Sequence, residues 1–423
     1  MTSNAPPRVL SGWDIAAIGL NAVIGSGIFL LPGSAAENLG PAALAAFAVA
    51  GGLCLLIALC FADAGSRFSG TGGPSLYAEA AFGPFVGFQV AWISWIIRVV
   101  SWAALANGFA MALAVVVPSL SEWTTQVATG VLVALGVANG FGVRLGASIV
   151  NGLTVVKLIP LLAFVAIGIF AADLGRLEPF APHGWSPLGA TVLLVLWAYA
   201  GFENVGVPAG EVRNPQRAVP RALVGVMALV TVLYLLVFWV AATTHPSLAG
   251  SGAPVAEAAM EVMGSVGGPF IAVGIAISVL GTCAGSAIVA PRFLYALVAD
   301  RPRFPILARL HPVTGAPIPA IVVSTVISVI LAASGSFEQL AVVSVVARFA
   351  QYIPTCLAVL VFQRRGSPPT QGFTLPGGPT IPVVTTVLCL GLLALAPGPR
   401  LLAGCAAVLA GLPAYGLLRR PGR

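Results

Sequence analysis

Long, nearly uncharged apolar runs recur along the whole chain, and they limit the folds that it can adopt. A helix needs about 20 apolar residues to cross the hydrocarbon core of a bilayer. Twelve runs of this kind are present, at about 12–36, 41–66, 84–117, 124–142, 149–171, 187–208, 219–243, 265–298, 318–333, 337–362, 379–396 and 400–418. The sequence therefore predicts an all-α integral membrane protein with 12 transmembrane helices.

The composition excludes an ordinary soluble domain. Only 8% of the residues are charged, against roughly a quarter in soluble proteins, and the mean hydropathy is +1.01. The six cysteines fall inside apolar runs without the spacing of metal ligands, so we expect small core residues and no cofactor. The first run carries Asn21 and is followed by further runs, which favours a retained helix over a signal peptide.

The distribution of basic residues predicts the orientation. The net charge is +7, but the basic residues lie between the apolar runs and not in one block, so no nucleic-acid partner is expected. With the N-terminus in the cytoplasm, 15 of the 20 basic residues lie on the cytoplasmic side. We therefore expect a multi-pass protein of the cell inner (plasma) membrane with both termini cytoplasmic. Arg98, Lys157 and Arg348 remain inside runs, where each needs a partner or a watery cavity.

The first and sixth runs are both interrupted, near 23–27 and 198–203. Because they are five runs apart, they cross the membrane in opposite directions, as in an inverted repeat. This predicts a first repeat over 1–171, a second repeat over 172–362, and two further helices over 363–423.

The first interruption places Val23 next to Gly25, Ser26 and Gly27. Glycine lets a helix unwind there and leaves backbone groups unpaired. Free amides at a half-helix N-terminus favour an anion, and free carbonyls at the preceding C-terminus favour a cation. A zwitterionic amino acid offers both charges. The alternative is that these small residues only allow close helix packing. The matching second interruption argues against this alternative.

Four segments of the sequence resemble the amino acid, polyamine and organocation (APC) transporter family. They are VIGSGIFLLPG at 23–33, AYAGFE at 198–203, GEVRNPQRAVPRA at 210–222 and APRFLYALVADRPRFP at 290–305, the last of which departs from the family pattern at Pro291 and at Asp300-Arg301-Pro302. The resemblance implies a leucine-transporter-like inverted repeat of five plus five helices with two C-terminal helices added. It also implies secondary transport of amino acids by alternating access.

The resemblance also implies a set of substrate contacts. The backbone amides of Ser26 and Gly27 would bind the substrate carboxylate, and the carbonyls of Val23, Trp197 and Ala200 would take its amino group. Phe202, beside the second interruption, is the aromatic residue best placed to act as a gate.

Lys157 in the fifth run has two readings. Its chain could snorkel towards the membrane surface, or, as the resemblance implies, its ammonium occupies the site that sodium fills in sodium-coupled relatives. Thr282 lies between Ser278 and Ser286 on one face of the eighth run. These hydroxyls either complete a polar pocket with Lys157 or serve helix packing.

Glu203 and Arg98 are the charged candidates for coupling or gating. Glu203 could brace the second interruption or act as a proton-linked gate, because an ionised carboxylate there needs a partner. For Arg98 we weigh a pair with Glu203, a contact to an acidic substrate side chain, and a gate contact. We favour the pair, which would leave the site neutral. Arg348 poses the same problem without an evident acidic partner.

These observations predict a secondary transporter of amino acid substrates that is coupled to protons or works as an exchanger. The predicted substrates are neutral amino acids. Acidic amino acids or polyamines are alternative substrates, and a non-transporting sensor is an alternative of another class. Neither a P-loop nor an HExxH or GxSxG motif is present, so an enzyme is not expected. The sequence makes no prediction of the oligomeric state.

Overall fold

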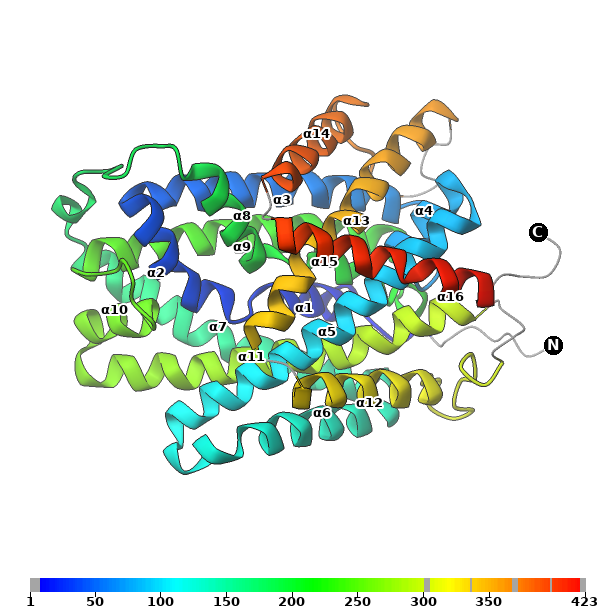
Figure 1. Ribbon diagram of the computed structural model, residues 1–423, viewed down its shortest axis with the longest axis horizontal. Helices are drawn as coiled ribbons and strands as arrows, with labels where there is room; N and C mark the ends of the chain where they lie inside the picture. The colour runs from blue at the N-terminus through cyan, green and yellow to red at the C-terminus, as the bar shows by residue number, and fades with distance from the viewer. Residues whose placement is uncertain (1–7, 300–304, 335–336, 367–371, 396–397, 419–423) are drawn as a thin grey trace.

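The computed structural model is all-helical in the part of the chain that it describes, residues 8–299, 305–334, 337–366, 372–395 and 398–418. A single isolated bridge joins Leu10 and Val212 there. Most of the long helices run roughly along the long axis of the molecule, whereas α13 lies oblique to it (Figure 1). The motif Asp300-Arg301-Pro302 and the basic residues after position 418 lie outside the described residues.

The α-helices follow one another with short connections. Their bounds are α1 Gly12–Val23, α2 Gly27–Leu39, α3 Ala43–Gly65, α4 Pro74–Phe82, α5 Pro84–Val116, α6 Thr124–Gly140, α7 Val143–Gly168, α8 Leu188–Tyr199, α9 Pro215–Thr244, α10 Pro254–Met263, α11 Gly267–Val298, α12 Ile318–Ser334, α13 Phe337–Arg364, α14 Thr380–Ala394, α15 Gly398–Leu409 and α16 Gly411–Leu418.

Six helical stretches of the described residues are long and apolar enough to cross a membrane. They are Gly12–Gly65, Pro84–Ala114, Ser148–Ala171, Leu188–Gly206, Pro215–Thr244 and Pro254–Val298. Shorter apolar helices follow, such as Ile318–Ser334 and Thr380–Ala394. Every predicted run contains helix, but the count of twelve crossings stays a prediction. Five of the six cysteines are buried as expected, whereas Cys405 is exposed.

The first predicted interruption is a true helix break. α1 ends at Val23, and α2 begins at Gly27 after a non-helical turn. The second break differs from the expected form, because no α-helix follows it directly. α8 ends at Tyr199, Gly201 has a φ of +130°, and a 3-10 turn covers Phe202–Gly206. Pro208, which lacks a backbone N–H, follows soon after and disfavours a continuing α-helix.

Backbone touches backbone where the two breaks meet, and this requires glycine. A Cβ atom on Gly201 would lie 2.4 Å from the carbonyl oxygen of Ala22. A Cβ atom on Gly27 would lie 2.8 Å from the Cα of Ala198. The positive φ of Gly201 is also a conformation that other residues rarely adopt. Glycine at these two positions therefore lets the broken helices approach each other.

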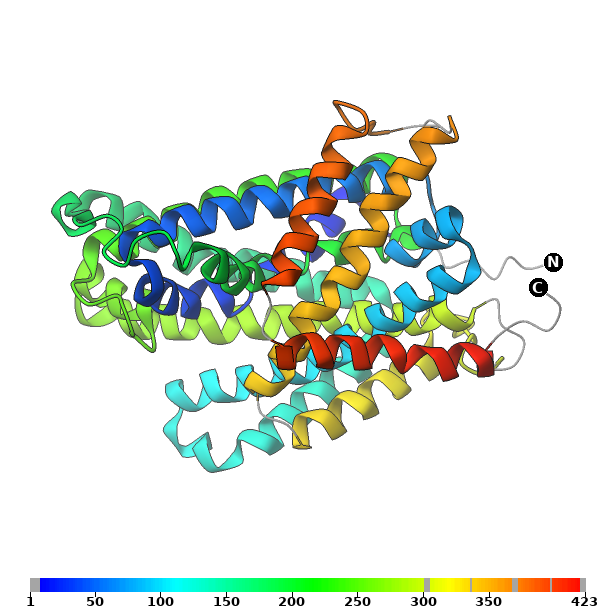
Figure 2. The ribbon, with the colours of Figure 1, turned by 45° about the horizontal axis from the view of Figure 1, so that its top comes forward.

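One end of the bundle is fastened by backbone and ionic contacts. Leu10 N–H donates to the Glu211 carbonyl at 2.8 Å, and Arg213 N–H donates to the Leu10 carbonyl at 2.8 Å. The buried guanidinium of Arg292 on α11 forms two bonds with the Glu211 carboxylate, one of 2.5 Å and one of 3.2 Å. α10 lies at the opposite end from α4 and α16 (Figure 2).

Removal of the Glu211 carboxylate should leave a buried guanidinium without its counter-charge. We expect Glu211→Ala to lower the free energy of unfolding by about 3–5 kcal/mol. Arg176→Ala is the control: it removes the half-exposed Arg176–Asp173 pair and one hydrogen bond to the Thr244 carbonyl, and it should cost about 1–2 kcal/mol. The free energy of unfolding is measured by denaturant or thermal unfolding in detergent. An equal decrease in the two variants would contradict a larger contribution from the buried pair.

The close contact between the two breaks predicts that two glycine-to-alanine variants differ in stability. Gly27→Ala places a methyl group against α8, and we expect a destabilisation of about 1–3 kcal/mol, the usual cost of overpacking. Gly52→Ala on α3 is the matched control, because nothing lies within 4 Å of its added methyl group. Unfolding midpoints of the two variants compared with wild type test this, and an unchanged midpoint in Gly27→Ala would contradict the close approach.

Candidate functional site

A cavity of about 50 Å³ lies where the two breaks face α5, α11 and α13. The predicted site residues that line it are Val23, Gly25, Ser26, Gly27, Arg98, Trp197, Ala200 and Thr282, and they are joined by Ala22, Ser101, Ala104, Leu105, Ala198 and Arg348. Residues 150 or more apart in sequence therefore border one small space. Three predicted residues, Lys157, Phe202 and Glu203, do not line it and lie behind its wall.

The N-terminus of α2 forms one side of the cavity. Ser26 is the cap residue, and its carbonyl accepts from the N–H groups of Phe29 and Leu30 at 3.1 and 3.2 Å. The first amides of a helix have no intrahelical acceptor, so they can bind an anion. The buried Ser26 hydroxyl also has no hydrogen-bond partner among the described residues.

The C-terminal carbonyls of α1 are held by a buried cation. The ammonium of Lys157, fully buried on α7, donates to the carbonyls of Asn21, at 2.9 Å, and Ile24. Thr282 on α11 donates to the Asn21 carbonyl at 2.9 Å, and Ser278 donates to the Ile24 carbonyl at 3.0 Å. A positive charge is favourable at a helix C-terminus. Lys157 therefore does not snorkel; it caps the broken helix.

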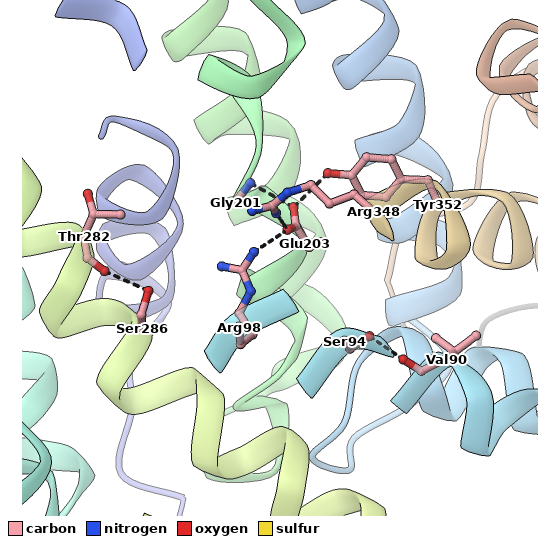
Figure 3. A network of polar contacts seen from close by, with 9 residues as sticks. All are labelled: Val90, Ser94, Arg98, Gly201, Glu203, Thr282, Ser286, Arg348 and Tyr352. Carbon is pink, nitrogen blue, oxygen red and sulfur yellow. Dashed lines mark hydrogen bonds and ion pairs between the residues drawn. The ribbon is translucent and has the colours of Figure 1, made fainter. Parts of the chain in front are cut away.

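The three predicted hydroxyls of α11 have different partners. Ser278 and Thr282 face the α1 carbonyls, as described above. Ser286 instead donates to the carbonyl of Thr282 at 3.0 Å within its own helix (Figure 3). The polar pocket around Lys157 thus contains two of the three hydroxyls.

Glu203 is the centre of a buried polar cluster (Figure 3). Its Oε1 accepts from Arg98 Nη2 at 3.2 Å and from Arg348 Nη1. Its Oε2 accepts from the Tyr352 hydroxyl at 3.1 Å and from Gly201 N–H at 2.9 Å. Every partner can donate, and two carry positive charge, so the cluster favours an ionised carboxylate. The predicted contact between Arg98 and Glu203 is present, and the carboxylate braces the second break.

Sequence reasoning missed the contribution of α13. The sequence alone gives Arg348 no evident acidic partner and does not single out Tyr352. The two are four residues apart and therefore share one face of α13. A second buried cation with a phenol one turn later was the available signal.

The missed Tyr234 connects the two breaks. Its hydroxyl lies 3.1 Å from the Val23 carbonyl and 3.2 Å from the Ala198 carbonyl. The single phenol proton on α9 is thus shared between carbonyls of the two broken helices. Tyr234 had no sequence signal, because a tyrosine inside an apolar run looks like any packing residue.

Phe202 has another environment than the one expected of a gate. It is fully buried and stacks on Tyr352 with ring centroids 5.5 Å apart. It also meets Phe61 edge to face at 5.9 Å. These contacts place it in the packing behind the Glu203 cluster, and its gating role stays a prediction.

A second, wider cavity of about 730 Å³ lies between α2, α5, α10 and α11. Ser26 lines this cavity as well as the smaller one. Its lining is mostly apolar, with Met111, Met260 and Val273 among its side chains, and it reaches the end of the bundle at α10. The side of the small cavity at Ser26 therefore borders a roomy space, whereas the opposite end of the bundle holds the Glu211–Arg292 pair.

Comparison with known proteins identifies the family. The family model for amino acid permeases matches residues 10–402. Cationic amino acid transporter 4 of Mus musculus is 28% identical over 399 residues, which are 88% of this chain and 62% of that protein. The methylthioribose transporter of Bacillus subtilis is 25% identical over 417 residues, 94% of this chain and 90% of that protein.

The serine/threonine exchanger SteT of Bacillus subtilis is 27% identical over 381 residues, 86% of this chain and 85% of that protein. The chain thus spans less than two thirds of the mouse relative and most of the two bacterial ones. Because the family model extends over nearly the whole chain, this membrane protein belongs to the amino acid permease family, within the APC transporters.

Proposed function

We propose that the protein is a secondary transporter of amino acids that works by alternating access in the cell inner (plasma) membrane. The observation that carries the proposal is the small cavity between two broken helices, with helix amides on one side and carbonyls on another. An amino acid offers the complementary charges. The mouse relative is named as a cationic amino acid transporter, and SteT is named as a serine/threonine exchanger.

In this proposal the substrate carboxylate binds the amides of Ser26 and Gly27. The ammonium group would bind carbonyls at the ends of α1 and α8. The Val23 carbonyl already accepts from Gly25 N–H at 2.9 Å and from Tyr234. The Trp197 carbonyl accepts from Ala200 N–H at 3.2 Å. Since a carbonyl has two lone pairs, the ammonium would depend more on the carbonyls of Trp197 and Ala200, residues that also line the cavity.

The proposed topology has 12 crossings: five plus five in an inverted repeat, then two more, with both termini cytoplasmic. The two breaks, in α1–α2 and after α8, support the repeat. In that orientation α10 and the wide cavity face outward, and the Glu211–Arg292 pair closes the cytoplasmic side. Substrate would enter past α10, and release would need this pair to open.

Lys157 supports coupling without sodium. Its ammonium binds the carbonyls at the end of α1, the position at which the resemblance places sodium in sodium-coupled relatives. A second cation beside a fixed one is repelled strongly in a low-dielectric interior. Proton coupling or exchange remains as the driving mode that we propose.

Counterflow in liposomes tests the proposed function. Purified protein is reconstituted with a high internal concentration of a mixture of the twenty amino acids, and uptake of trace labelled amino acids is followed one by one. We expect transient accumulation of some of them, equal in sodium and potassium buffers. Binding without any flux would support the sensor alternative, and a sodium requirement would reject the role given to Lys157.

Lys157→Met tests the internal cation directly. The variant removes the charge that caps α1 but keeps an unbranched apolar chain of similar length. We expect uptake to fall at least about tenfold, because carbonyls of Asn21 and Ile24 lose a charged donor worth about 1.5–3 kcal/mol. Lys157→Arg serves as the control that keeps the charge. Full uptake by Lys157→Met would contradict the proposed role.

A further inference from the structure

The ionic cluster at Glu203 contains more positive than negative charges. Among the described residues, the buried acidic side chains are Asp63, Glu203 and Glu211, and the buried basic ones are Arg98, Lys157, Arg292 and Arg348. Asp63 pairs with Arg67, and Glu211 pairs with Arg292. Glu203 is therefore left to two guanidiniums, and the cluster carries a formal charge of +1.

This count changes the basis of the neutral-substrate prediction. That prediction set one cation, Arg98, against Glu203. The structure adds Arg348 on the same carboxylate oxygen. Arg98 and Arg348 also both line the small cavity, whereas Glu203 does not. The charge that borders the cavity on this side is positive.

Among the other groups around the cavity, the carbonyls at the C-terminus of α8 are negative and are those proposed for the substrate ammonium, and the remaining groups are positive or already paired. The N-terminus of α2 contributes the positive end of a helix dipole. The negative end of α1 is matched by Lys157. Tyr352, the remaining titratable partner in the cluster, donates to Glu203. No acidic side chain among the described residues lines the cavity.

Polar atoms in the wall are also left without partners. Arg348 Nε, Ser101 Oγ and Ser26 Oγ are buried and have no hydrogen-bond partner among the described residues. All three residues line the cavity. Buried donors are nearly always hydrogen-bonded in folded proteins. Two of these donors, on α13 and α5, belong to the helices that carry Arg348 and Arg98.

We propose that the substrate carries a second carboxylate, so that the site selects acidic amino acids. This inference rests on the proposed function and names its substrate class. The α-carboxylate binds at α2, and the side-chain carboxylate binds between Arg98, Arg348 and the Ser101 hydroxyl. A guanidinium holds a carboxylate with charge-assisted, often paired hydrogen bonds. A ligand with net charge −1 neutralises the cluster, whereas a zwitterion leaves it at +1.

Isosteric ligand pairs give the cleanest test. Binding of aspartate and asparagine, and of glutamate and glutamine, is measured by titration of the purified full-length protein in nanodiscs. Members of each pair differ in charge and little in size. We expect the acidic member to bind at least about tenfold more tightly, since a hydrogen bond to a charged group contributes more than a neutral one.

Variants assign the preference to its residue. Arg98→Gln leaves Glu203 with Arg348, Tyr352 and Gly201 N–H, so no charge is stranded, and we expect the preference to fall about tenfold. Arg98→Lys keeps the charge and should keep more of the preference than Arg98→Gln. Arg221→Gln, an exposed cation on α9, is the control for overall charge and should leave the preference unchanged.

The outcomes separate this inference from the proposed function. Equal or tighter binding of asparagine and glutamine, or binding of none of the four, overturns the acidic-substrate inference. Tighter asparagine binding in chloride than in gluconate assigns the extra anion site to chloride and also overturns it. Preferential binding of the acidic ligands without flux in liposomes supports the inference and sinks the proposed transport function.

Discussion

The constraint on which this structure depends is that a backbone without regular helix must still satisfy its polar groups inside a membrane. Each unpaired N–H or C=O in hydrocarbon costs several kcal/mol. The breaks at Ile24–Ser26 and Ala200–Gly201 create unpaired backbone groups. Side chains around the breaks form hydrogen bonds with several of them. Lys157, Thr282 and Ser278 satisfy the carbonyls of α1. The first amides of α2 have no intrahelical acceptor, and they are the groups that we propose bind the substrate carboxylate.

The same constraint explains why buried charge gathers at the breaks. A guanidinium or carboxylate taken out of water is unfavourable unless its partners are well placed. Glu203 meets this condition with donors from α5, α13 and its own turn. Through Gly201 N–H it also fixes the backbone conformation of the second break. A charged side chain therefore acts as a structural clamp on the same segment that lines the site.

Much of the site could be predicted from sequence because its chemistry is local. Gly25-Ser26-Gly27 marks a break by composition alone, and Lys157 and Arg98 stand out because charge is rare in apolar runs. The contribution of Arg348 could not be predicted in this way. Its partner lies 145 positions away, and helix periodicity does not specify which face of α13 meets Glu203. The turns after Gly201 were missed because apolar composition does not separate an α-helix from 3-10 turns.

In the proposed site, backbone atoms bind the groups that all amino acids share, and side chains bind the group that differs. This arrangement explains how one fold can transport different substrates. The contacts proposed for the carboxylate and ammonium groups come from backbone atoms of α1, α2 and α8. Any related protein that keeps the two helix breaks keeps these backbone atoms, whatever its side chains are. In our proposal the side chains that distinguish one amino acid from another are Arg98 and Ser101 of α5 and Arg348 of α13, which line the cavity. Arg98 and Ser101 lie one turn apart on α5, so a few substitutions on that face would change the charge at the site and leave the breaks intact. Specificity can therefore vary among relatives while the backbone part of the site and the fold persist.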